Sequence, residues 1–146
     1  MIVVQRCANG RVCDLSFEFD TSRAIYRQIA EEVARQIVRG SFAPGDKLPP
    51  VREMAVRMGV NPNTMARAYT ELEGRGLVVS RRGLGCFVCE GTRQIAAEQW
   101  TLALAAGDQF VREIRDLGLD EESLERLRTL IQQDLPTNGG SGGGDD

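Results

Sequence analysis

Cysteines are the residues of this chain whose type and spacing could do chemistry, because the 146-residue sequence contains no histidine. Cys86 and Cys89 form a Cys-x-x-Cys pair, and Cys7 and Cys13 lie near the start of the chain. Four thiolates can hold a zinc ion in a tetrahedral site. However, Cys86 and Cys89 fall in a predicted strand, where side chains three positions apart point to opposite faces. We therefore expect buried or unreactive thiols and no metal, with a metal- or thiol-sensing role as the alternative.

Other catalytic groups are scarce in the sequence. Without histidine there is no Ser-His-Asp triad, and the most common general base and metal ligand are missing. No Gly-x-x-x-x-Gly-Lys phosphate loop occurs, and the run 83–85 is too short to form one. Glu121 and Glu122 suit the first turn of a helix, where the helix dipole favours negative charge. We therefore expect a protein that is not an enzyme and that needs no cofactor.

Charge is unevenly distributed along the chain. Residues 21–90 hold 11 Lys or Arg and 7 Asp or Glu (net +4), whereas the rest holds 7 and 14 (net −7), giving −3 in total. A basic segment beside an acidic one favours a polyanion as the partner of the basic segment. No apolar run approaches the roughly 18 residues of a membrane helix, and the start lacks the pattern of a signal peptide. We therefore expect a cytoplasmic protein without a membrane segment.

The elements that must position any site begin with a helix near residue 23. Phe17 and Phe19 alternate with polar neighbours, which predicts a short strand before it. Thr21 or Ser22 is expected to cap the helix, because their hydroxyl oxygens can accept from its free N–H groups. Apolar residues then recur at helical spacing, and Gly40 ends the pattern.

Two short helices joined by a tight turn follow. The second helix is predicted from Pro50 to Gly59, with Met residues facing inward. The third begins with Asn61 as its N-cap and Pro62 as its first helical residue. This arrangement is the helix-turn-helix pattern.

A β-hairpin is predicted directly after the third helix. Residues 77–80 and 86–89 are apolar and β-prone, and the loop 81–85 between them is basic and rich in glycine. Three helices and a hairpin make a winged helix-turn-helix domain at residues 16–91. The segment 1–15 is an N-terminal extension of undecided structure.

The remaining residues change character and predict a two-helix arm over residues 92–135. Gly118 separates its helices and Asp120 caps the second one. So few residues cannot form an independent core, which favours covering their apolar stripes with a second copy of the chain. Residues 136–146, rich in glycine, are predicted to be disordered. The residues expected at the dimer interface are Leu102, Phe110, Ile114, Leu117, Leu124, Leu127 and Ile131. The expected fold class is therefore mainly α with a small β-hairpin.

Residues 25–90 resemble the GntR family of bacterial regulators. The resemblance is carried by Ile25–Ile29, by GSFAPGDKLP at 40–49, by Val51–Ala55, by VNPNTMARAYTELEGRGLV at 60–78 and by the hairpin 81–88. The Asn-Pro-Asn-Thr turn and the two-helix arm are similar to the YtrA-like subfamily in particular. These motifs are long, occur in order and cover roughly half of the chain.

The resemblance implies which residues contact DNA. An Arg early in the second helix, the start of the third helix and the tip of the wing carry the family's contacts. Arg can bind guanine or phosphate, Asn can bind adenine, and Gly lets the wing backbone approach the minor groove. By position these residues are Arg52, Asn61, Asn63, Thr64, Arg67, Arg82 and Gly83.

The resemblance also implies a homodimer that binds an inverted repeat in double-stranded DNA and represses transcription by steric exclusion. The chain leaves no room for the larger effector-binding domain of other subfamilies, so whether a small molecule regulates it cannot be read from the sequence. Besides the metal- or thiol-sensing regulator, a protein-interaction adaptor that uses the acidic arm is the other class we consider. A salt-dependent affinity for DNA separates the two.

Overall fold

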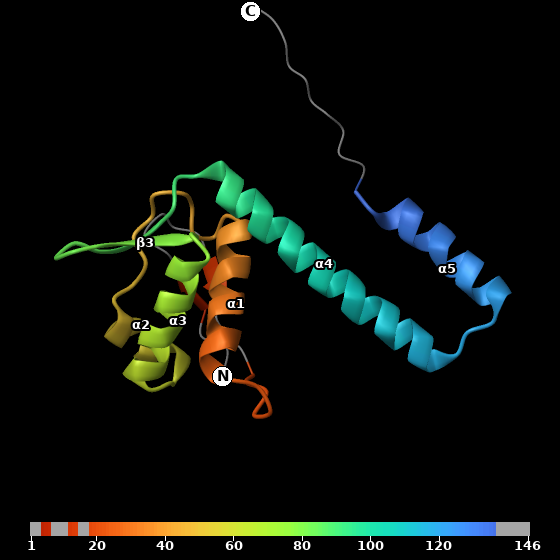
Figure 1. Ribbon diagram of the computed structural model, residues 1–146, viewed down its shortest axis with the longest axis horizontal. Helices are drawn as coiled ribbons and strands as arrows, with labels where there is room; N and C mark the ends of the chain where they lie inside the picture. Colours follow the sequence, from red (N-terminus) through yellow and green to blue (C-terminus); the bar gives the residue numbers. More distant parts are fainter. Residues whose placement is uncertain (1–3, 7–11, 15–17, 137–146) are drawn as a thin grey trace, which may run out of the picture. The chain divides into compact units, whose positions relative to one another are not determined.

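The computed structural model describes residues 4–6, 12–14 and 18–136 (Figure 1). The chain divides between Ala105 and Ala106, inside one long helix, into two compact units that are described separately below. The expected class, mainly helical with a small hairpin, is confirmed. The elements in order are β1 Val4–Arg6, β2 Val12–Asp14, α1 Ile25–Val38, α2 Val51–Met58, α3 Pro62–Gly74, β3 Val78–Arg81, β4 Gly85–Val88, α4 Thr92–Leu117 and α5 Glu121–Asp134.

The core of the first unit forms where α1 and α2 both pack against α3 (Figure 1). Met54, Met65 and Tyr69 are buried in this core, while Met58, which like Met54 lies in the helix whose methionines were predicted to face inward, packs against it and is partly buried. Burying one such side chain stabilises the fold by about 1.5–3 kcal/mol. The largest fully buried apolar side chains are Ile29, Val33, Ile37, Leu48, Met54, Met65, Leu72, Leu77, Val78 and Val88.

The start of α1 differs from the sequence expectation. Residues 18–20 form no strand, and the N-cap of α1 is Ala24, which has no side chain able to cap. The buried side chain of Gln28 organises the entry instead, since its Nε2 donates to the Asp20 carbonyl (2.7 Å) and its Oε1 accepts from the Asp20 N–H (2.8 Å). The cap prediction for Thr21 or Ser22 was therefore wrong, because an amide one turn into the helix satisfies the preceding loop. Phe17 lies outside the described residues.

The turn between α2 and α3 follows the prediction. Gly59 ends α2 in the left-handed conformation (φ 65°), which glycine adopts at little cost. Asn61 is the N-cap of α3, and its Oδ1 accepts from the Asn63 N–H at 2.8 Å. Pro62 occupies the first turn, where a missing N–H leaves no bond unmade. The turn thus fixes the direction in which the start of α3 points.

The wing is an antiparallel pair whose strands are shifted from the prediction by one residue at each end. β3 and β4 pair from Val78 with Val88 to Arg81 with Gly85, so the turn between them is shorter than the five residues expected. Gly83 in that turn has a φ of 75°. An isolated bridge from Lys47 to Phe87 ties the wing to the loop before α2.

β1 and β2 form a separate antiparallel pair within the N-terminal extension, where the sequence left the structure undecided. Cys13 lies in β2, and Cys7 lies outside the described residues.

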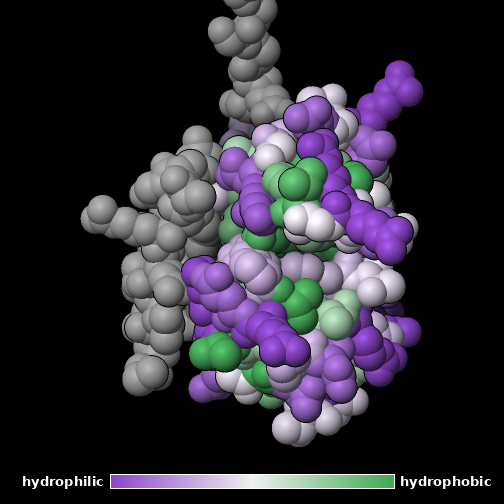
Figure 2. Space-filling view, turned by 90° about the vertical axis from the view of Figure 1, so that its left-hand side faces the viewer, coloured by the Kyte–Doolittle hydropathy of each residue, from purple (hydrophilic) through white to green (hydrophobic). Residues whose placement is uncertain are grey.

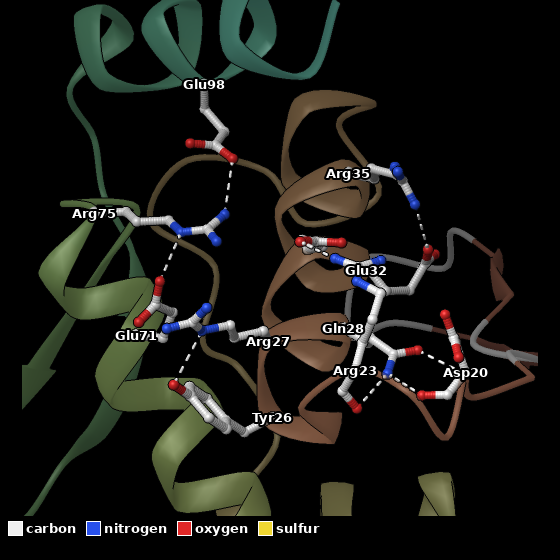
Figure 3. Close-up of polar contacts among 11 residues, drawn as sticks. Asp20, Arg23, Tyr26, Arg27, Gln28, Glu32, Arg35, Glu71, Arg75 and Glu98 are labelled. Carbon is white, nitrogen blue, oxygen red and sulfur yellow. Dashed lines mark hydrogen bonds and ion pairs between the residues drawn. The ribbon is translucent and has the colours of Figure 1, made fainter. Parts of the chain in front are cut away.

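A polar link joins the end of α3 to the first part of α4 within the first unit (Figure 3). Arg75 donates from Nη1 to Glu98 (3.1 Å) and from Nε to Glu71 (3.4 Å). Glu98 is only 8% exposed, and nearby Ile95 packs against the core. A buried carboxylate needs such a partner, so this ion pair attaches the N-terminal part of α4 to the DNA-binding domain.

The second unit contains the end of α4 and the whole of α5. Gly118 (φ 61°) ends α4, and Asp120 caps α5 by accepting from the Ser123 N–H at 2.8 Å, as predicted. No side chain between residues 106 and 136 is buried in the single chain. In the part of the chain described, no helix is long and apolar enough to cross a membrane. The tail predicted to be disordered lies outside the described residues from 137 onward.

Candidate nucleic-acid interface

The exposed face of α3 carries the polar side chains expected to read DNA. Asn63 and Arg67 are exposed one turn apart, Thr64 is half-buried, and Met65 on the opposite face is buried. The oxygen of Asn61 is engaged in the cap of the helix, so this residue shapes the N-terminus as well as lying beside it. Asn and Arg side chains at the start of such a helix can bind adenine and guanine edges in the major groove.

Arg52 lies exposed in the first turn of α2. Its neighbour Glu53 pairs with Arg57 one turn further on, so this carboxylate is engaged elsewhere. The N-cap of α2 is Pro50, which provides no side-chain hydrogen bond to the helix. Arg52 thus lies at an open helix start beside the reading face.

The wing tip presents a second group of cations. Arg82 and Gly83 are both exposed at the turn, while Arg81 lies over the ring of Phe87 at 5.0 Å from its centroid. Lys47 pairs with Phe87 through its backbone, and its side chain runs along β4 to Gly85, so close that a side chain on Gly85 would meet it. Figure 2 shows the face over α2 and the wing as charged and polar side chains around a few apolar ones.

A groove of about 590 Å³ runs between α3 and the wing. Its floor includes Tyr69, whose hydroxyl donates to the Pro49 carbonyl at 2.6 Å, and burial raises the pKa of that phenol. A phosphodiester backbone separates the major and minor grooves of DNA. The hollow lies between α3, which would enter the major groove, and the wing, which would approach the minor groove. It can therefore accommodate the phosphodiester backbone between those grooves.

Some arginines of the described residues are engaged in ion pairs and others are not. Arg23, Arg35, Arg57, Arg75 and Arg128 each lie within 4.0 Å of a carboxylate oxygen. In contrast, Arg52, Arg67 and Arg82 have no carboxylate within that distance among the residues the structure describes. All three are exposed and belong to the set proposed to contact DNA. Cations without a carboxylate partner are available to phosphates and bases. The same lack of a carboxylate partner holds for other exposed arginines of the described residues, namely Arg27, Arg39, Arg81, Arg93, Arg112, Arg115 and Arg126. It is therefore the position of Arg52, Arg67 and Arg82 on the helix-turn-helix and the wing that sets them apart.

The two cysteines of the wing region lie in different settings. Cys86 is half-buried in β4 and lines the groove, and burial raises the pKa of its thiol. Cys89 is buried, and its Sγ lies 3.8 Å from the Gly91 carbonyl. A raised pKa lowers the fraction of reactive thiolate, which disfavours thiol sensing at Cys86. Among the described residues, no three His, Cys, Asp or Glu side chains are grouped to hold a metal ion.

The residues predicted for dimerisation are distributed along the arm. Leu102 belongs to the first unit and is half-buried. Phe110 and Leu117 are exposed. The other four are half-buried in the second unit: Ile114, Leu124, Leu127 and Ile131. α5 also carries an apolar groove of about 350 Å³ lined by Leu127, Leu130, Ile131, Asp134 and Leu135.

Several residues with a place at these surfaces were missed from the sequence. Thr70 is exposed one turn after Ala66 and lines the groove with it, and Lys47 lines the same groove at the foot of the wing. On α4, Trp100 and Leu104 are exposed apolar residues one turn apart. Spacing by three or four residues along each helix could have revealed Thr70 and Leu104, whereas the approach of Lys47 to the wing depends on the tertiary fold.

These features define a winged helix-turn-helix protein with the geometry of a DNA reader. A family model described as bacterial regulatory proteins of the gntR family matches residues 25–88. The chain belongs to this family of DNA-binding transcriptional regulators, which are not enzymes, and among them it is similar to the short YhcF- and YtrA-like regulators.

The similarity to these relatives covers more of the chain than the DNA-binding domain alone. The chain is 41% identical over 116 residues to the uncharacterized HTH-type transcriptional regulator YhcF of Bacillus subtilis, covering 79% of this chain and 96% of YhcF. It is 33% identical to the HTH-type transcriptional repressor YtrA of the same organism, covering 79% and 89%. A GntR family transcriptional regulator from Listeria monocytogenes superposes with a TM-score of 0.68 at 35% identity, covering 77% of this chain and 99% of that structure.

Proposed function

We propose that this regulator is a repressor that binds an inverted-repeat operator as a homodimer, in the cytoplasm where chromosomal DNA lies. Arg52, Asn63, Thr64 and Arg67 would read base edges and phosphates in the major groove, with Asn61 shaping the start of α3. Arg82 and Gly83 would approach the neighbouring minor groove. The observation that carries the proposal is that the helix-turn-helix and the wing each present exposed arginines, Arg52, Arg67 and Arg82, that have no carboxylate within ion-pair distance among the described residues.

The dimer follows from the arm. None of the described residues of the second unit, 106–136, is buried in the single chain, although α4 and α5 both carry apolar stripes there. A second copy related by a two-fold axis would let the same surface cover itself. Joining two readers also multiplies affinity for two half-sites through a high effective concentration. Repression would then follow when the bound dimer excludes polymerase, and the printed name of the relative YtrA, a repressor, agrees with this direction.

Selection of bound sequences from random double-stranded DNA tests this function. We expect the full chain to enrich one sequence with two inverted half-sites, roughly one helical turn apart between their centres. Transcription from a promoter carrying that sequence should fall when the protein is added in vitro. Enrichment of no sequence would contradict sequence-specific regulation. A single half-site would contradict the symmetric dimer, and increased transcription would contradict repression.

Arg82→Ala is expected to weaken binding to operator and random DNA by a similar factor. The wing arginine would neutralise a phosphate, and each such contact contributes about 0.9 to the slope of log affinity against log salt. The slope, measured by titration at several salt concentrations, should therefore fall by about 0.9 per wing.

The matched control is Arg128→Ala, which removes a cation held by Glu121 and Glu125 on α5. This variant should leave both affinity and salt slope unchanged. If Arg82→Ala altered base preference without altering the slope, the wing would be reading sequence and our assignment of its role would be wrong.

A further inference from the structure

Tyr26 is a residue of α1, outside the helix-turn-helix, that lies directly against a reading residue. It occupies the first turn of α1 and packs, partly buried, against the core. The guanidinium of Arg67 lies over its ring, with Cζ 4.2 Å from the ring centroid. A guanidinium at this distance over an aromatic face is attracted by the electron-rich ring.

The Tyr26 ring has a second polar contact besides Arg67. Its hydroxyl accepts a hydrogen bond from Arg27 Nε at 3.1 Å (Figure 3). The packing of α1 on α3 brings this ring and Arg67 together. Tyr26 therefore presents its ring to Arg67 from a position that packing against the core supports.

Stacking differs from ion pairing in what it leaves free. The N–H donors of arginine lie in the plane of the guanidinium, so a ring above that plane leaves them unoccupied. Arg75 offers the contrast within the same region, because its Nε and Nη1 are already occupied by Glu71 and Glu98. Arg67, whose guanidinium carbon lies over the Tyr26 ring, has no side-chain hydrogen bond to the described residues, so its N–H donors are open to a base.

The surroundings leave that edge accessible. A hollow of about 480 Å³ lies between α1 and α3, lined by Tyr26, Arg67, Thr70, Glu71, Gly74 and Arg75. Arg67 is exposed on α3 one turn after Asn63. The Arg67 side chain thus contacts the Tyr26 ring and remains exposed to solvent.

We propose that Tyr26 is a specificity-determining positioning residue, whose ring holds Arg67 in the orientation that binds the O6 and N7 edge of a guanine bidentately. This inference rests on the proposed function, because it needs a sequence-specific operator. Arginine and guanine form the bidentate pair that major-groove geometry favours most. Holding the guanidinium before binding reduces the rotamer freedom lost on contact, and this advantage applies only to the base pair that Arg67 reads.

The test uses the full chain and the operator found by selection. Each base pair of the half-site is changed in turn, with the same change made in both half-sites, and the affinity is measured each time. Arg67→Ala should abolish discrimination at one G·C pair. Tyr26→Leu should lower discrimination at the same pair by about five- to thirtyfold, the range expected for losing one cation–π contact in each half-site. Tyr26→Phe keeps the ring and should keep the discrimination. In the Arg67→Ala background, Tyr26→Leu should have no further effect at that pair.

A structural role for Tyr26 would give a different pattern. A uniform loss of affinity for all sequences in Tyr26→Leu would overturn the proposal. Equal effects of Tyr26→Leu and Tyr26→Phe would overturn it too, because they would show that the hydroxyl, for example through a phosphate contact, matters and the ring does not. Thermal unfolding should show wild-type stability, and Tyr26→Met replaces Tyr26→Leu in the same comparison if that variant is destabilised. If the wild-type chain showed no base preference at all, the proposed function would fail, and with it this inference. If the wild-type chain discriminates between base pairs and Tyr26→Leu discriminates equally well, the proposed function stands and only the role of Tyr26 is refuted.

Discussion

Phe110→Asp in the full chain is expected to convert a dimer into a monomer at micromolar concentration. Phe110 is 40% exposed in the single chain, so an aspartate there meets solvent in the monomer and should leave its fold intact. In a two-fold dimer the substitution occurs twice at the interface. Each copy would lose about 1.5–3 kcal/mol of apolar burial, which together weakens dimerisation by at least about 100-fold. Sedimentation equilibrium measures this shift directly.

The control for this variant is Ala105→Asp. Ala105 is also exposed on α4, and the same charge is added to the same helix, but it lies outside the apolar stripe that contains Phe110. Ala105→Asp should remain dimeric. If wild-type protein were monomeric at tens of micromolar, or if Phe110→Asp dimerised as tightly as wild type, the arm would not be the dimer interface.

The compact units also indicate where the arm can be removed. A chain ending near Gly91 would lose Ile95 from the core and leave Arg75 without Glu98. A chain ending at Ala105 keeps both contacts, because the first compact unit ends there. Such a chain should be monomeric and should occupy the two half-sites of the operator independently.

The sequence predicted the elements of the reader well because local signals there agree with tertiary packing. Asn61 and Pro62 mark the start of α3 by their own chemistry, and Gly59 marks the end of α2 by its positive φ. At the residues just before α1, the local signals and the tertiary packing do not agree. Thr21 and Ser22 are good capping residues, but the buried amide of Gln28 satisfies the Asp20 backbone from a position eight residues away.

The candidate site shows the same division. The resemblance to a known family predicted Arg52, Arg67 and Arg82 as DNA contacts, and helix and hairpin periodicity accounts for their exposure. Periodicity does not reveal what each side chain contacts. The stacking of Arg67 on Tyr26 joins residues from two helices, and the run of Lys47 over Gly85 depends on the hairpin folding back onto the loop before α2. Contacts of this kind require the packed structure.

The largest effect on operator recognition is expected from Arg52→Ala and Arg67→Ala. Both side chains are exposed, and among the described residues neither lies within ion-pair distance of a carboxylate, so their removal leaves no buried charge unpaired. Each bidentate base contact contributes about 1–3 kcal/mol, and a symmetric dimer loses the contact in both half-sites. Operator affinity should therefore fall at least about tenfold for each variant at fixed salt.

Arg57→Ala is the matched control, because Arg57 lies on the same helix as Arg52 but is already paired with Glu53. Its removal should change operator affinity far less, once urea unfolding has shown that each variant retains its stability. Random DNA gives the second comparison: a base-reading arginine should lose more affinity for the operator than for random DNA, whereas a phosphate-binding one should lose both equally. If neither Arg52→Ala nor Arg67→Ala reduced operator affinity tenfold, these helices would not contain the reading residues, and the exposed arginines of α2 and α3 would have to be assigned another role.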